Sequence, residues 1–101
     1  MGGVHFYQLL GLANRARKII SGEELVLNDL KKNRVKLVII ANDASERTKK
    51  KMRDQCAHYQ VRIVGAGDRF ALGHAIGKEQ RVVLGVTDEG FARKLLINLG
   101  Q

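Results

Sequence analysis

The most constraining feature of this chain is a short, dense apolar run at residues 35–41, Val-Lys-Leu-Val-Ile-Ile-Ala. The run is rich in β-branched residues and shows no regular alternation of apolar and polar side chains. That pattern is typical of a central strand that is covered on both faces. The run is also far too short to span a bilayer. We therefore expect the chain to fold around a buried strand at these positions.

Helical and strand patterns alternate along the rest of the 101-residue chain. Apolar residues at helical spacing predict helices at residues 4–16, 23–32 and 70–76, a third helix from residue 43, and a last helix capped by Thr87 or Asp88. Strand patterns occur at residues 18–21, 61–64 and 81–86. The alternation indicates an α/β fold, with a small sheet between layers of helices. The length predicts one domain over residues 1–101.

Two of the expected helix starts show the pattern of a capping box. Ser21 is followed three residues later by Glu24, and Asp43 is followed by Glu46 at the same spacing. In this motif the first side chain accepts a hydrogen bond from the third helical N–H. The third helix is further expected to bury a narrow stripe formed by Ala44, Thr48, Met52 and Cys56.

The charge of the chain points to a polyanionic partner. Eighteen Lys and Arg residues face ten Asp and Glu residues, which gives a net charge of +8 and a pI near 10.1. A basic surface releases counterions when it docks on phosphates, so nucleic acid is the favoured partner, with plain solubility as the alternative. The basic cluster comprises Lys31, Lys32, Arg34, Lys36, Arg47, Lys49, Lys50, Lys51 and Arg53. On the third helix these charges are equally consistent with a binding face and with an ordinary solvated face. Lys31, Lys32 and Arg34, in contrast, lie where a phosphate backbone can meet them.

Catalytic chemistry has little support in the sequence. Gly65-Ala-Gly67 follows a strand, but Phe70 stands where a dinucleotide loop needs its third glycine, and no phosphate loop exists. Cys56 is the lone cysteine and falls on an apolar stripe, so we expect a buried thiol rather than a nucleophile. The histidines are scattered at positions 5, 58 and 74. We expect no enzyme activity, cofactor, metal or small-molecule substrate.

The start of the chain also lacks a basic segment followed by an apolar run, so no signal peptide is expected. The sequence predicts a soluble, cytoplasmic protein without a membrane partner.

Two blocks of the sequence resemble a known family. The first is Gly22, then Leu27 and Leu30 at helical spacing, then the stretch Lys-Lys-Asn-Arg-Val-Lys-Leu-Val-Ile-Ile-Ala-Asn-Asp at residues 31–43. The second is Ala-Leu-Gly-His-Ala-Ile-Gly-Lys at residues 71–78, followed by Arg-Val-Val at residues 81–83. Both resemble the kink-turn-binding ribosomal proteins L7Ae and L30e. The stretches at residues 9–18, 21–24 and 87–92 resemble the bacterial YlxQ-type branch of that family.

The resemblance implies a three-layer α/β/α sandwich around a four-stranded mixed sheet. It also implies a non-catalytic protein whose partner is structured RNA, either a kink-turn or a related bend, with ribosomal RNA as the expected target and ribosomal proteins as possible neighbours. A kink-turn is a sharp bend in an RNA helix that contains sheared G·A pairs.

The family's recognition helix departs from its common pattern in this chain. The pattern Gly-x-Asn-Glu-x-x-Lys falls on Gly22, Glu24, Leu25 and Asn28, so only the glycine is kept. Leu25 cannot bond a guanine edge, and Asn28 can bond a base but brings no charge. A protein-interaction module that has lost the kink-turn code is therefore the alternative, and an exposed Leu25 in an apolar patch would favour it.

The second half of the family's RNA site is the loop before the fourth helix. Here Arg69 is suited to phosphate and Phe70 to stacking on an extruded base, with packing at the helix start as the alternative for Phe70. The full expected RNA-binding face is Gly22, Glu24, Asn28, Lys31, Lys32, Asn42, Arg69 and Phe70.

Overall fold

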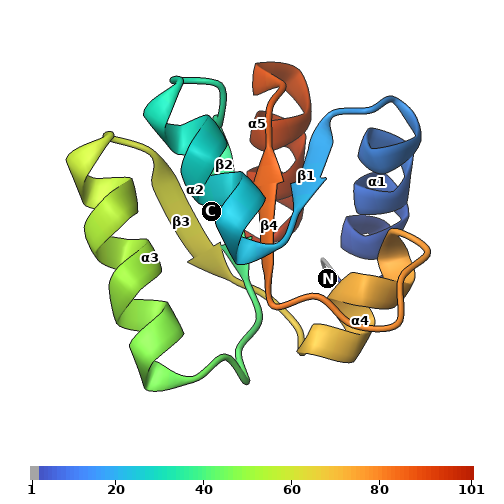
Figure 1. The fold of residues 1–101 in the computed structure, drawn as a ribbon. Helices are drawn as coiled ribbons and strands as arrows, with labels where there is room; N and C mark the ends of the chain where they lie inside the picture. The colour runs from blue at the N-terminus through green and yellow to red at the C-terminus, as the bar shows by residue number, and fades with distance from the viewer. Residues whose placement is uncertain (1–2) are drawn as a thin grey trace.

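A four-stranded mixed sheet forms the middle of the molecule (Figure 1). The computed structural model describes residues 3–101, with side chains from His5 onward. The strands lie in the order β1 (Ile19–Ser21), β4 (Val83–Val86), β2 (Leu37–Ile40) and β3 (Arg62–Gly65). β2 and β3 are parallel, whereas β4 is antiparallel to both of its neighbours. The apolar run is thus an inner strand, as predicted.

Helices cover both faces of this sheet. On one face lie α2 (Glu23–Lys31) and α3 (Glu46–His58), which are in front of the sheet in Figure 1. On the other face lie α1 (Gly3–Arg15), α4 (Arg69–Ala75) and α5 (Glu89–Asn98). The predicted three-layer α/β/α sandwich with a small mixed sheet is confirmed.

The two faces of β2 explain why its sequence lacks alternation. Leu37 and Ile39 pack into the core shared with α1, α4 and α5. Val38 and Ile40 pack into the core shared with α2 and α3. All four side chains are buried, so neither face of the strand tolerates a polar residue.

Both predicted capping boxes are wrong. Ser21 lies in β1. The N-cap of α2 is instead Gly22, with a φ of 104° and a ψ of 143°, and it has no side chain that could cap the helix. α3 begins later than expected, because Ser45 is its N-cap and its hydroxyl accepts a hydrogen bond from Thr48 N at 3.1 Å. The Asp43 carboxylate does not cap α3, because it accepts hydrogen bonds from Arg69. The last helix is capped by Asp88, as predicted, with its carboxylate accepting from Phe91 N at 2.9 Å.

Smaller differences lie at the ends of elements. Ala16 is exposed and follows the end of α1. The fourth strand begins two residues later than expected, at Val83. The buried stripe of α3 narrows to Met52 and Cys56, because Ala44 is buried but precedes the helix, and Thr48 is only half-buried.

Gly73 is required by a close approach between α4 and the loop that leads to β4. A Cβ at this position would lie 2.5 Å from Gln80 Cα and 2.7 Å from Gln80 N. These are backbone atoms, so the clash could be relieved only by a shift of the loop backbone at Gln80. The contact holds the segment before β4 against α4.

We expect Gly73→Ala to lower the free energy of unfolding by roughly 1–3 kcal/mol, because it overpacks a backbone contact. Urea denaturation would measure the change. The matched control is Gly90→Ala in α5, where the nearest atom to the new Cβ is the Asp88 carboxylate oxygen at 3.2 Å, which is a side-chain atom. That oxygen also caps α5 and must shift slightly, so we expect a smaller loss than for Gly73→Ala; equal stability of both variants would contradict the tight backbone contact.

Candidate nucleic-acid interface

The register of the sheet gathers several chain segments at one edge. Ile40 at the end of β2 pairs with both Gly65 and Val83. Ser21 at the end of β1 pairs with Leu84. The ends of β1, β2 and β3 and the beginning of β4 therefore share an edge, which is the lower edge in Figure 1. α2 and α4, whose starts carry most of the predicted RNA-binding residues, both begin at this edge. We call it the recognition edge.

The start of α2 is fixed to this edge by the backbone. Gly22 N donates to Val83 O at 2.9 Å. The positive φ of Gly22 is a conformation that other residues rarely adopt, and a Cβ there would meet no atom within 4 Å. The glycine is thus needed for its backbone angles rather than for space.

The outward face of α2 carries Glu24, Asn28 and Lys31 at spacings of four and three residues. All three are exposed, and the inward face is formed by the buried Val26 and Leu30. Residues at these spacings lie above one another along a helix. The face is therefore a polar strip that runs from the recognition edge along the helix.

Leu25 is 57% exposed beside this strip. Its neighbours at the next helical turn are Asn28 and Asp29, which are polar. An isolated exposed leucine is ordinary on protein surfaces. The protein-interaction alternative, which required an apolar patch around Leu25, thus gains no support from the face of α2.

Arg69 ties the start of α4 to the loop after β2. Its Nε lies 3.0 Å from Asp43 Oδ2, its Nη2 donates to Asp43 O at 2.8 Å, and its backbone N donates to Asp43 Oδ1 at 3.0 Å. Desolvation raises the pKa of the Asp43 carboxyl, but the hydrogen bonds and charge of Arg69 outweigh it and leave that pKa below its ordinary value. Much of the guanidinium is therefore used within the protein.

Phe70, the next residue, projects from the start of α4. Its side chain is 52% exposed and belongs to neither buried cluster, in contrast to Phe6, which is 1% exposed. Core packing therefore does not explain Phe70. An exposed ring at a loop edge is suited to stacking on an unpaired base.

Arg81 is not identified by the sequence, which places it only in a strand. Its backbone N donates to Arg69 O at 2.9 Å, and its Nε donates to Ser21 Oγ at 3.3 Å. It therefore bridges the start of α4 and the end of β1, one residue before Gly22. A basic residue at the start of the predicted strand is the only signal in the sequence, and it does not say which segments the side chain will join.

The structure brings together six of the eight predicted site residues and separates two. Asn42 lies at the recognition edge, where its backbone N donates to Gly67 O at 2.7 Å. Lys31 and Lys32 lie at the far end of α2, whose nine residues rise roughly 13 Å along the helix axis. The residues at or near the recognition edge are Gly22, Glu24, Asn28, Asn42, Arg69 and Phe70.

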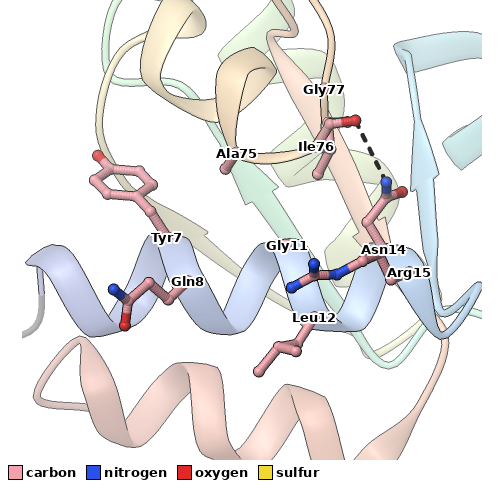
Figure 2. Close-up of a pocket in the computed structure, with 9 residues that line it drawn as sticks. All are labelled: Tyr7, Gln8, Gly11, Leu12, Asn14, Arg15, Ala75, Ile76 and Gly77. Carbon is pink, nitrogen blue, oxygen red and sulfur yellow. Dashed lines mark hydrogen bonds between the residues drawn. The ribbon is translucent and has the colours of Figure 1, made fainter.

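A hollow of about 580 Å³ between α1 and the end of α4 contains none of these residues (Figure 2). Its lining is Tyr7, Gln8, Gly11, Leu12, Asn14, Arg15, Ala75, Ile76 and Gly77. Tyr7 and Arg15 are its ionisable members, and the Asn14 amide donates to Ile76 O at 3.3 Å, joining α1 to α4. The lining lacks a carboxylate, thiol or imidazole, so it offers no general acid–base pair at neutral pH.

Other catalytic or metal chemistry is equally unsupported in the described part of the chain. Residues 3–101 contain no group of three or more His, Cys, Asp or Glu residues that could hold a metal ion. Burial raises the pKa of the Cys56 thiol to about 11, which disfavours the thiolate. Over the same residues, no helix is both long and apolar enough to cross a membrane.

The fold and this edge define a class: a small, basic α/β/α sandwich that presents an exposed polar helix beside a loop with an exposed aromatic ring. A comparison of the sequence with known protein families identifies the family. Residues 5–96 match the ribosomal protein L7Ae/L30e/S12e/Gadd45 family, and the chain belongs to this family.

Individual relatives include two bacterial proteins named RNA-binding protein YlxQ. The one from Bacillus subtilis (strain 168) is 51% identical over 96 residues, covering 95% of this chain and 96% of the relative. The one from Enterococcus faecium is 44% identical over 86 residues, covering 85% and 82%. Membership of this family, together with these names, confirms the prediction that the chain is not an enzyme.

Solved structures show the same fold. A protein of unknown function from Bacillus halodurans C matches with a TM-score of 0.92 and 47% identity, covering 95% of this chain and 97% of that one. The Giardia lamblia 15.5kD RNA binding protein matches with a TM-score of 0.80 and 20% identity, covering 98% and 85%. At that identity the likeness concerns the fold alone.

We expect Asp43→Asn to destabilise the protein at neutral pH, because Arg69 loses its ionised partner. The folded-state pKa of Asp43 is depressed, so its contribution is present above its ordinary value of 3.8 and is lost as pH falls through the lower folded value. The stability difference between wild type and variant should therefore shrink in strong acid. Urea midpoints across pH would measure it, with Asp54→Asn as the control, since the ion pair of Asp54 in the described structure is with exposed Lys50. A difference that grows in acid would refute the assignment.

Proposed function

We propose that this chain is a non-catalytic RNA-binding protein that grips a kink-turn or a related bend, with ribosomal RNA in the cytoplasm as its target and ribosomal proteins as neighbours. The observation that carries the proposal is the recognition edge itself. An exposed polar helix face and an exposed phenylalanine from a distant segment lie at the same edge of the sheet. The relatives named as RNA-binding proteins support the same class of ligand.

Two polar groups of the α2 face, those of Asn28 and Glu24, have matching partners on RNA bases. The Asn28 amide both donates and accepts, so it suits the edge of an unpaired or sheared base. The Glu24 carboxylate accepts from the N–H groups of guanine but repels phosphate. This pair differs from the Asn, Glu and Lys of the common family pattern, so we propose a variant recognition code.

The neighbouring loop supplies the shape of the site. Phe70 stacks on an extruded base, while Arg69 and Asp43 hold the start of α4 so that the ring keeps its position. Arg81 fixes the same loop to the end of β1. Asn42 adds a polar group at the edge, and Lys31 and Lys32 meet phosphates farther along α2.

The test compares binding of the pure protein to a kink-turn RNA and to a straight duplex of equal length, at low and moderate salt. We expect preferential binding to the kink-turn that persists as salt rises. Phe70→Ala and Asn28→Ala should each weaken kink-turn binding by roughly 1–3 kcal/mol, because the first removes a stacking ring and the second removes a hydrogen bond to a base.

The matched control for Phe70 is Leu12→Ala, which removes a similarly exposed apolar side chain from α1. We expect this variant to bind like the wild type. Equal and steeply salt-dependent binding of the wild type to both RNAs would mean that charge alone is responsible. The kink-turn proposal would then be abandoned.

A further inference from the structure

The edge of the sheet opposite the recognition edge gathers a second set of basic loops. Lys36 N donates to Val86 O at 2.7 Å, and Thr87 N donates to Lys18 O at 2.9 Å. The loop from α1 to β1 and the loop from α2 to β2 therefore lie on either side of the end of β4, at the upper edge in Figure 1. We call this the basic edge.

A hollow of about 420 Å³ opens at the basic edge. It is lined by Arg17, Ile20, Asp29, Asn33, Arg34, Lys36 and Thr87. Three of these side chains are cationic and one is a carboxylate. A concave surface lined mainly by one sign of charge concentrates ions of the opposite sign.

The backbone fixes the positions from which these cations project. Arg17 has a φ of 62° and its N donates to Asn14 O at 2.9 Å, which closes the turn after α1. Arg34 N donates to Asp29 O at 3.0 Å, which closes the turn after α2, where Asn33 has a φ of 57°. The cations thus stand on closed turns rather than on open loops.

These cations are also free of ion pairs. Among the described side chains, none of Arg17, Arg34 and Lys36 lies within 4.0 Å of a carboxylate oxygen. Four further exposed basic residues lie within two positions of a lining residue along the chain: Arg15, Lys18, Lys31 and Lys32. The nearby carboxylates are Asp29 in the lining and Asp88 and Glu89 at the start of α5, and Asp88 is engaged as an N-cap.

The other strongly basic surface, the outer face of α3, is more nearly neutralised. Lys49 pairs with Glu46 at 3.6 Å and Lys50 with Asp54 at 3.0 Å. Lys51 pairs with Glu23 at 3.0 Å. Arg47 and Arg53 are in none of the ion pairs among the described side chains, so α3 has two unpaired cations on its outer face where the hollow has three.

α2 connects the hollow to the recognition edge. The helix begins at the recognition edge and ends beside the hollow, roughly 13 Å away along its axis. Its last turn carries Lys31, followed by Lys32 at the C-cap. A phosphate backbone that passes Asn28 along the outward face of α2 would meet Lys31 and Lys32 and then the cations of the hollow.

We propose that the hollow of Arg17, Arg34 and Lys36 is a second RNA-binding site, which holds the phosphate backbone of one arm of the bound RNA. The inference rests on the proposed function for its RNA, but the hollow reads no bases. Its contribution is sequence-independent and depends on salt.

The experiment compares two triple variants of equal charge. The hollow variant is Arg17→Asn, Arg34→Gln and Lys36→Gln, with Asn chosen because it tolerates the positive φ of Arg17. The control variant is Arg47→Gln, Lys50→Gln and Arg53→Gln on the exposed face of α3. Circular dichroism first establishes that both variants are folded. Binding is then measured against salt for a kink-turn RNA with full arms, the same RNA with each arm trimmed in turn, and a straight duplex.

We expect the hollow variant to bind the full-armed RNA more weakly than the control variant. Its slope of log K against log salt should be shallower by roughly 1 for each phosphate that the variant no longer neutralises. Trimming one particular arm should remove the difference between the hollow variant and the wild type. The preference for kink-turn over duplex should stay as in the wild type.

Equal losses in both triple variants would overturn the proposal, since net charge would then suffice, and so would a hollow variant that binds like the wild type. A wild-type protein that does not prefer the kink-turn would defeat the proposed function without deciding this one. In that case the measurement on the straight duplex decides. Weaker duplex binding by the hollow variant than by the control variant supports the second site, and equal duplex binding by the two variants overturns it.

Discussion

The pairing of β2 with β4 is the constraint on which the rest of the molecule depends. β2 is buried on both faces, and its pairing with β4 and β3 sets which residues arrive at each edge of the sheet. Ile40 lies opposite both Val83 and Gly65, and Ser21 lies opposite Leu84, so the loops at these ends of all four strands lie at the same edge. Gly22, Asn42, Arg69 and Arg81 come from distant parts of the chain and lie at this edge because of the strand pairing.

Much of the fold is visible in the sequence because it depends on local patterns. The apolar run at residues 35–41 predicts a buried strand, and apolar residues at helical spacing predict α2. The sequence mispredicts the caps of α2 and α3, because a capping motif describes hydrogen bonds that compete with others. Ser21 is held in a strand, and Asp43 is taken by an arginine 26 residues away.

The candidate site is less predictable than the fold, because it depends on register and on the direction of side chains. Resemblance to a family identifies Gly22 and Phe70 by position, but not the exposure of the ring. Arg81 becomes visible only when its bonds to Ser21 and Arg69 are known. Lys31 and Lys32 are close to the other site residues along the sequence, yet the length of α2 places them at its far end.

The attachment of α2 at both ends has a consequence for any RNA that follows the helix. Gly22 is bonded to β4 at one end, and the turn after Asp29 is closed at the other. Because α2 is held at both ends, we expect the RNA rather than the helix to change shape when the two bind. Under the proposed function, the free-energy cost of bending would therefore lie in the RNA, and conditions that bend the RNA in advance would strengthen the complex.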